Sequence, residues 1–231
     1  MFVVIKKTIK KVFHWYGYDI TTTIPAESVD DLRGEEREFF GNIQVVEREM
    51  YERLCNHDVD KIHYGCGSTL LGVGWINIDL PLHCSEDTGF YLSANLVSRH
   101  PFPSDFFRYS FAEDFLEHLD QCQSLIFLSE AFRTLRQGGA FRLSFPGLRG
   151  VLRRHYRSSD YDGALVGKHE AYSMWGHNHF YCEESLTIVA SHIGFSKIEF
   201  VDYGNSRHED LRNLDSRPDQ RDLNIYAELT K

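Results

Sequence analysis

The segment Lys61–Leu80 constrains the fold most, because it joins a short apolar strand, a glycine turn and a second strand that ends at an acid. Lys61–Tyr64 is the first strand. The glycines of Gly65–Gly67 lack side chains, so backbone N–H groups can approach a ligand closely. Trp75–Leu80 is a second apolar run, and Asp79 lies near its end, where open α/β sheets place ligand-binding groups. The segment therefore predicts a site for a nucleoside-type cofactor.

Length, charge and cysteine usage limit the class of protein. The 231 residues suit one large domain with a substantial core. A formal net charge of −9 argues against a general nucleic-acid binder, which would carry a basic surface. The five cysteines include no C-x-x-C pair, so a zinc ribbon or a disulfide framework is disfavoured and a reducing compartment is favoured. The first apolar run is too short for a signal peptide or membrane span. We expect a cytoplasmic protein.

Residues 1–57 show no strand alternation, and we expect an N-terminal helical cover segment there. The first part is basic and amphipathic, with lysines among apolar residues at Lys6, Lys7, Lys10 and Lys11. Such a helix can make weak peripheral contact with an anionic membrane. We favour the alternative that it packs on the domain with its lysines in solvent, since one short segment binds membranes weakly.

Residues 58–231 alternate strands with helices, which predicts an α/β domain with a mostly parallel sheet. Helical spacing of apolar residues marks Gln121–Gln137, which we expect Gly138 to end, and Glu183–Ile193. The last two strands have no helix between them, so we expect an antiparallel pair. Strands are expected at 61–64, 75–80, 90–96, 106–112, 141–145, 198–203 and 223–229. Residues 147–181 interrupt the alternation and are expected to form an insert.

The glycine turn does not match the common nucleotide motifs. Leu70 occupies the third glycine position of G-x-G-x-x-G, and Asp79 follows Gly67 by twelve positions, fewer than the dinucleotide fingerprint requires. No Gly-Lys-Ser/Thr follows the turn, as a Walker phosphate loop would need. NAD and ATP are therefore disfavoured as cofactors.

Short motifs follow one another along the chain in an order that is more specific than any one of them. They are HYGCG (63–67), GWINIDL (74–80), PFP (101–103), FLEHL (115–119), EAFRTLRQGG (130–139), FRLSFP (141–146), HFYCEESL (179–186) and HIGF (192–195). In this order they resemble class I S-adenosylmethionine-dependent methyltransferases, in particular a small bacterial branch often associated with surface-polysaccharide synthesis. The resemblance covers roughly residues 60–230. Gln137, where "PGG" is usual, and His63, in an apolar strand, depart from the pattern.

The resemblance implies a Rossmann-like doubly wound sheet of about seven strands, with the last antiparallel and helices on both faces. It makes 58–231 the methyltransferase domain and 147–181 its substrate-loop insert. The implied cofactor is S-adenosyl-L-methionine, with the glycine turn at the methionine portion and an acid on the ribose. The implied cofactor-binding residues are Tyr64, Gly65, Cys66, Gly67, Asp79, Asn95, Leu96 and Glu113.

Histidines supply the candidate general bases for methyl transfer to an oxygen. His118 is the first choice, because it follows the fourth strand near the expected methyl group; the alternative is a histidine that bonds backbone at the turn. His177 and His179, in the insert, are the next candidates. The HNH triplet at 177–179 lacks the ββα pattern of a metal-dependent nuclease. A zinc site from His169, His177 and His179 is less favoured than solvated histidines, so we predict no metal.

An arginine cluster gives the best indication of substrate. Arg153, Arg154 and Arg157 lie within a stretch without acids, and guanidinium groups suit phosphate or carboxylate. We therefore expect a small anionic or glycan acceptor, such as a nucleotide-linked or phosphorylated sugar. A solvated basic helix face is the alternative for any one arginine. The alternative function is a catalytically degenerate binding or scaffold protein on the same fold.

Overall fold

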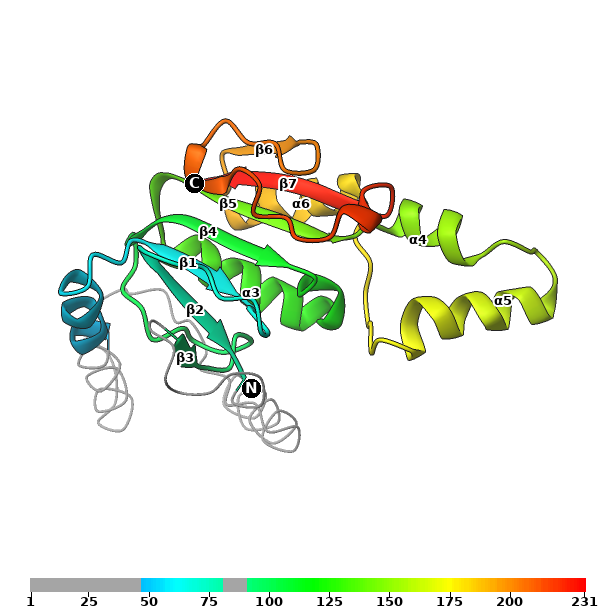
Figure 1. Cartoon of the computed structure of the whole chain (residues 1–231), viewed down its shortest axis with the longest axis horizontal. Helices are drawn as coiled ribbons and strands as arrows, with labels where there is room; N and C mark the ends of the chain where they lie inside the picture. Colours follow the sequence, from blue (N-terminus) through cyan, green and yellow to red (C-terminus); the bar gives the residue numbers. More distant parts are fainter. Residues whose placement is uncertain (1–46, 81–90) are drawn as a thin grey trace, which may run out of the picture.

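A single mixed sheet organises the computed structural model, which describes residues 47–80 and 91–231 (Figure 1). Its seven strands run in the order β3-β2-β1-β4-β5-β7-β6. All pairs are parallel except those that β7 makes with β5 and β6, which are antiparallel. The strands are β1 (Lys61–Tyr64), β2 (Trp75–Asp79), β3 (Tyr91–Ser93), β4 (Phe107–Glu113), β5 (Leu135–Pro146), β6 (Lys197–Phe200) and β7 (Asn224–Thr230). This confirms the predicted fold class.

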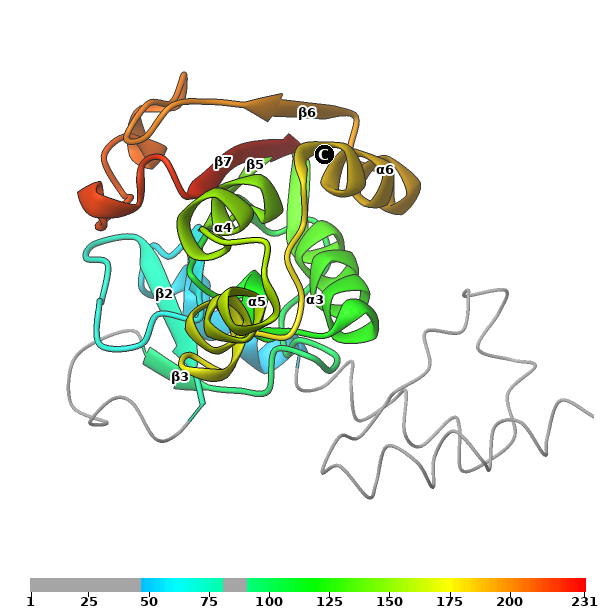
Figure 2. The ribbon, with the colours of Figure 1, turned by 90° about the vertical axis from the view of Figure 1, so that its right-hand side faces the viewer.

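Helices α3 (Gln121–Thr134) and α6 (Glu183–Ile193) lie side by side on one face of the sheet (Figure 2). The insert forms helices α4 (Leu148–His155) and α5 (Tyr161–Lys168), which extend beyond the sheet in Figure 1. The remaining short elements are η2 (Leu116–His118), the π-helical turn η3 (His169–Ser173), η4 (Glu209–Leu211) and η5 (Pro218–Gln220).

The end of α3 differs from the sequence prediction, which extended the helix to Gln137. The helix stops at Thr134, and Leu135 already has extended geometry as the first residue of β5. Leu135 is fully buried and pairs with Phe107 of β4, so its side chain enters the core from a strand. Gly138, with φ +71°, lies inside β5 and does not cap the helix. Burial of Leu135 therefore overrides the helical spacing.

Most of the predicted N-terminal segment lies outside the described residues. Residues 47–55 are helical, and Met50 and Leu54 pack on the main core beneath the sheet. The basic amphipathic segment with its proposed membrane contact falls within 1–46, which are not described. In the described ranges, no helix combines the length and apolarity needed to cross a membrane.

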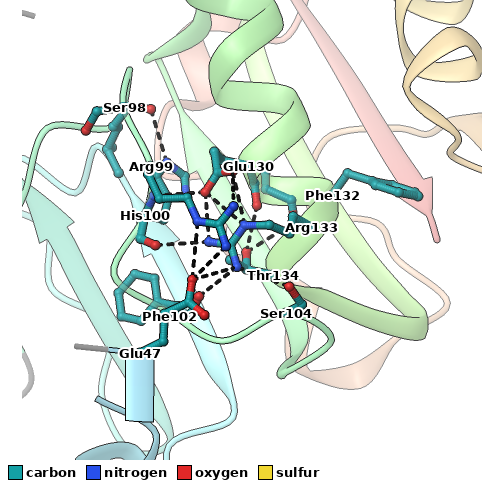
Figure 3. Close-up of polar contacts among 12 residues, drawn as sticks. Glu47, Ser98, Arg99, His100, Phe102, Ser104, Glu130, Phe132, Arg133 and Thr134 are labelled. Atoms are coloured by element: carbon teal, nitrogen blue, oxygen red, sulfur yellow. Dashed lines mark hydrogen bonds and ion pairs between the residues drawn. The ribbon is translucent and has the colours of Figure 1, made fainter. Parts of the chain in front are cut away.

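Arg133, near the end of α3, ties together segments that are far apart in sequence (Figure 3). Its guanidinium donates to the Glu130 carboxylate at 2.8 Å and to the carbonyl oxygens of His100 and Phe102 at 2.9 and 2.8 Å. Glu47, in the N-terminal helix, lies 3.5 Å from the same guanidinium. One side chain thus holds the loop before β4 and the N-terminal helix against α3.

The face of the sheet opposite α3 is covered in the described structure by η4 and the loops of residues 204–222. Leu211 of η4 packs with Trp75 and Phe111 in a second apolar cluster. Beside it, Arg142 of β5 is fully buried on this face.

The Arg142 guanidinium is satisfied entirely by protein groups around it. It donates through Nε and Nη2 to the Asp215 carboxylate, at 3.1 and 2.5 Å, and through Nη1 to Glu228 at 3.1 Å. The same Nη1 donates to the carbonyl oxygen of Asn205 at 2.8 Å. Asp215 also accepts the backbone N–H of Gly204 at 2.6 Å. This buried network attaches residues 204–215 to the centre of the sheet.

We expect Asp215→Ala to lower the free energy of unfolding by about 3–5 kcal/mol, because it leaves the Arg142 charge buried with half of its partners missing. Urea unfolding monitored by circular dichroism measures the change, with Asp222→Ala, an exposed aspartate, as the matched control. Equal stability of the two variants would contradict the assigned role of Asp215.

Two buried histidines are neutral in the fold. Burial lowers the pKa of His63, on β1, and of His100 to about 4. His63 donates through Nδ1 to the Asn77 side-chain oxygen at 3.2 Å, and the His100 ring packs on Tyr64. Both rings therefore resist protonation at pH values where an unfolded histidine, with a pKa near 6.5, accepts a proton.

This difference predicts a stability that is complete above pH 6.5 and falls as the pH drops towards 4. The unfolded chain binds protons in that window that the folded chain does not, which costs about 1.4 kcal/mol per pH unit for each histidine. Urea unfolding at pH 7 and pH 5 should show a shallower loss for His63→Leu than for the parent protein. His57→Gln, at an exposed site, should keep the parent slope; a parent-like slope in His63→Leu would refute the assignment.

Candidate active site at the carboxyl ends of the strands

The glycine turn follows β1 at the point where the sheet order reverses, between β1 and β4, and Asp79 ends the adjacent strand β2. Gly65 and Gly67 both have positive φ angles, +62° and +51°. The Gly67 N–H donates to Asp79 Oδ2 at 2.6 Å, and the Leu80 N–H donates to Asp79 Oδ1 at 2.7 Å. The Asp79 carboxylate is therefore fixed beside the turn, where doubly wound folds bind ligands.

Asn77 explains why the connection between β1 and β2 can be so short. Its side-chain oxygen accepts the Leu71 N–H at 2.8 Å, and its amide donates to the Leu71 carbonyl at 3.0 Å. This pair of bonds satisfies the backbone of a loop that replaces the usual crossover helix between β1 and β2. Asn77 is a positioning residue that the sequence motif contained but that we did not single out.

The other predicted cofactor residues surround the same edge. Tyr64 is buried and its hydroxyl group hydrogen-bonds to Thr134, so its side chain belongs to the core. Asn95 accepts the Val97 N–H through its side-chain oxygen, which keeps one lone pair for a further donor. Cys66 and Leu96 are buried beside them.

Glu113, the last residue of β4, has both carboxylate oxygens engaged. Ser216 donates its backbone N–H to Oε1 at 2.8 Å and its hydroxyl to Oε2 at 2.5 Å. Burial raises the pKa of this carboxyl despite those two donors. Glu113 therefore connects β4 to the loop that covers the sheet, and any contact with a cofactor would be additional to that role.

A cavity of about 650 Å³ opens between the end of β4 and the helices of the insert. Gly65 packs against Phe115, so the glycine turn adjoins the segment 114–118 that forms one wall. Helix α4, η3 and η5 form the opposite walls. The charged and titratable residues that line it are Asp114, Glu117, His118, Arg154, His155, Arg157, Glu170, His177, Arg217 and Asp219.

Glu117, His118 and His177 converge on one wall of this cavity. Oε1 of Glu117 lies 4.0 Å from Nε2 of His118 and 4.0 Å from Nε2 of His177. The two imidazole rings are 4.9 Å apart between centroids. Glu117 is 1% exposed, whereas the His118 side chain is 42% exposed and faces the cavity. Burial, followed by the charge of Asp114, raises the pKa of Glu117 well above its usual value.

Hydrogen bonds to backbone carbonyl groups join the Glu117–His118 turn to the segment that contains His177, 60 positions later in the sequence. The N–H groups of Asn178 and His179 donate to the Glu117 carbonyl at 2.8 and 3.2 Å. The Asn178 side chain donates to the His118 carbonyl at 2.7 Å. The insert is thereby fastened to the turn after β4, which brings His177 to His118.

The predicted histidine and arginine candidates separate into two groups. His118, His177, Arg154 and Arg157 line the cavity. The His179 ring instead stacks edge-on against Tyr181, at 4.6 Å between centroids. Its neighbourhood is partly buried, and this burial lowers the pKa of the imidazole.

Arg153 is exposed on α4 and is not part of the cavity wall in the described structure. Arg154 donates to the Asp219 carbonyl at 2.8 Å, and Arg157 lies 3.7 Å from the Glu170 carboxylate. Sequence reasoning missed Arg217, which pairs with Asp114 at 2.8 Å. No local signal marks Arg217, because only the folding of residues 204–222 over the sheet brings it to the cavity.

Glu117 was not among the site residues predicted from the sequence. An acid directly before a histidine, after a strand end that already carries two acids, is a signal that was available. The burial of Glu117 could not be predicted from the sequence, because it depends on the packing of the insert, residues 147–181, against the turn after β4.

Comparison with solved structures identifies the fold. A S-adenosylmethionine-dependent methyltransferase from Archaeoglobus fulgidus aligns with a TM-score of 0.51 and 14% identity, over 85% of this chain and 97% of that one. One from Mesorhizobium loti aligns with a TM-score of 0.51 and 16% identity, over 80% and 98%. A Thermotoga maritima protein described as a possible histamine N-methyltransferase gives 0.50 and 13%, over 84% and 95%. The chain has the fold of the S-adenosylmethionine-dependent methyltransferases, as predicted.

Comparisons of the amino-acid sequence find no similar protein, in contrast to the comparison of structures. A scan against protein-family models finds no match, and a search of curated proteins finds no relative.

Two glycines of the turn offer a matched pair of substitutions. A Cβ at Gly65 would lie 2.5 Å from the Phe115 ring, whereas a Cβ at Gly67 would meet none of the residues that the structure describes within 4 Å. Both would bear the cost of a positive φ, about 1–2 kcal/mol. Gly65→Ala should therefore destabilise more than Gly67→Ala in urea unfolding, by the cost of displacing Phe115. Equal losses in the two variants would contradict the close packing of the turn.

Proposed function

We propose that the protein is an S-adenosylmethionine-dependent methyltransferase that methylates an oxygen of a small acceptor, a sugar or another anionic molecule. The observation that carries the proposal is the adjacency of two features at one sheet edge. The glycine turn is bonded to the Asp79 carboxylate, and the neighbouring cavity is lined by His118 and His177. The fold provides the context in which this edge binds ligands.

The described residues suit the methyl donor. No described residue other than its chain neighbours lies within 4 Å of the position of a Cβ on Gly67, and Asp79 retains lone pairs beyond those used by its two backbone donors. Asp79 would accept the ribose hydroxyls, and Asn95 would accept the adenine amino group. When bound, S-adenosylmethionine supplies a methyl group that the acceptor oxygen bonds as the carbon–sulfur bond breaks, with that electron pair remaining on sulfur.

His118 is the proposed proton acceptor for the acceptor hydroxyl. Its ring is accessible from the cavity, and its Nε2 lies 4.0 Å from the Glu117 carboxyl group. Partial exposure lets the proton leave to solvent after transfer. His177 is the second candidate, since it shares the same carboxyl group. His179 is a weaker one, because its ring lies on Tyr181.

Cationic side chains support an anionic acceptor. Arg154, Arg157 and Arg217 all line the cavity, and guanidinium groups bind phosphate or carboxylate oxygens in pairs. Arg153 contributes only if the insert rearranges. A sugar acceptor of surface-polysaccharide synthesis fits this wall but rests on the sequence resemblance.

Calorimetry with S-adenosylmethionine and S-adenosylhomocysteine tests the proposed cofactor. We expect a Kd in the micromolar range, about −8 kcal/mol, for the parent protein. Asp79→Ala should weaken binding at least tenfold, because charge-assisted hydrogen bonds contribute about 1.5–3 kcal/mol. Asp79→Asn keeps an acceptor for the Gly67 N–H and separates folding from binding, and Asp222→Ala is the control.

Absence of binding by the parent protein would overturn the cofactor assignment. Binding without transfer of a labelled methyl group to any member of a panel of phosphorylated and nucleotide-linked sugars would instead favour the scaffold alternative. Mass spectrometry of the panel measures transfer directly.

A further inference from the structure

The Glu117–His118–His177 cluster has the donor atoms of a metal site. Two imidazole nitrogens and a carboxylate oxygen lie within 4.8 Å of one another. Such a combination of two histidines and one carboxylate binds zinc in catalytic sites and iron(II) in oxygenases. Three ligands on one wall leave the remaining coordination positions open to the cavity.

The tautomer of His177 is set by a partner outside the cluster. Its Nδ1 lies 2.7 Å from the carbonyl oxygen of Ala171, which can only accept a hydrogen bond. Nδ1 therefore carries the hydrogen, and Nε2 of the neutral ring presents its lone pair towards Glu117. Metal-bound histidines are commonly oriented by this kind of outer hydrogen bond.

The Glu117 carboxyl group has a polar atom that the protein leaves unsatisfied. Oε2 is buried and has no hydrogen-bond partner among residues 47–80 and 91–231, although the side chain is almost completely enclosed. A buried carboxylate oxygen without a donor is unfavourable. Oε1 of the same carboxyl group faces Nε2 of His118 and Nε2 of His177, each at 4.0 Å, so a cation placed between these three atoms would engage this carboxyl group.

We propose that Glu117, His118 and His177 bind one divalent transition-metal ion on the wall of the cavity. Zinc ligands lie about 2.0–2.2 Å from the metal, which places tetrahedral ligand atoms about 3.3 Å apart. The two Glu117–histidine separations of 4.0 Å therefore need to contract by about 0.7 Å, and the separation between the two imidazole nitrogens, at most 4.8 Å, by up to about 1.5 Å. His118 has the most exposed side chain of the three, so its ring can rotate towards an ion with the least disturbance of the core.

Cation binding by these three side chains does not require the proposed methyl transfer to take place. With the ion bound, the acceptor would be activated by a route other than the metal-free one proposed above, in which His118 takes the proton. A hydroxyl group coordinated to the metal loses its proton more readily, and the proton passes to cavity water. His118 then serves as a ligand and is not the proton acceptor. Asp114, paired with Arg217 on the same wall, is a neighbouring charge and not a required ligand.

Metal binding by the full-length protein tests the proposal directly. After treatment with a chelator and dialysis, the protein is titrated with Zn²⁺, Mn²⁺ and Co²⁺ by calorimetry, and bound metal is counted by mass spectrometry. We expect one ion per chain for at least one of the three metals, with visible absorption bands of bound Co²⁺. Glu117→Gln, which keeps the side-chain shape, should weaken binding at least tenfold.

His118→Gln is the second ligand variant, chosen because its partly exposed side chain tolerates replacement without loss of the fold. It should also weaken binding at least tenfold. His169→Gln and His192→Gln, at exposed positions, should bind as the parent does. The proposal is overturned if the parent binds no ion, or if both ligand variants bind as tightly as the parent. Loss of binding in His169→Gln would equally overturn it, in favour of a different ligand set.

Discussion

The buried guanidinium of Arg142 is the interaction on which the rest of this molecule most depends. A charge on the face of a central strand is tolerated only with complete compensation, and Asp215, Glu228 and the Asn205 carbonyl provide it. Since Asp215 belongs to the polar loop after β6, the pairing fastens that loop over the sheet. The same loop then carries Ser216 to Glu113 and Arg217 to the cavity. An ion pair in the core thereby organises the chemistry at the sheet edge.

Two kinds of contact form the candidate site: the pairing of strands in the sheet, and hydrogen bonds between the insert and the turn after β4. Parallel strands end at one edge, so the glycine turn, Asp79 and the segment after β4 come together through sheet geometry alone. The cavity wall needs more, because His177 arrives from the insert. Hydrogen bonds from Asn178 and His179 to the backbone of Glu117 and His118 bring it there. Displacing the insert would remove His177 and expose Glu117 together.

Much of the fold was predictable from residue patterns, and the failures arise from contacts between segments that are distant in sequence. The apolar spacing predicted the bounds of α6 correctly, whereas it predicted that α3 ends at Gln137, three residues beyond its observed end. The spacing continues past Thr134, but Leu135 is buried from a strand paired with Phe107. For the site, His118 was chosen from its position after a strand. The contribution of Glu117 was missed because its burial depends on a segment some sixty positions later.

The sequence by itself determined the alternation of strands and helices, the glycine turn with its acid, and the antiparallel ending of the sheet. Those features follow from backbone geometry and side-chain periodicity within short stretches. Only the tertiary structure decided which polar residues meet: Arg142 with Asp215, Glu113 with Ser216, and Glu117 with two histidines. Pairings of this kind join segments distant along the chain, and burial, which sets their charge state and strength, exists only once the chain has folded.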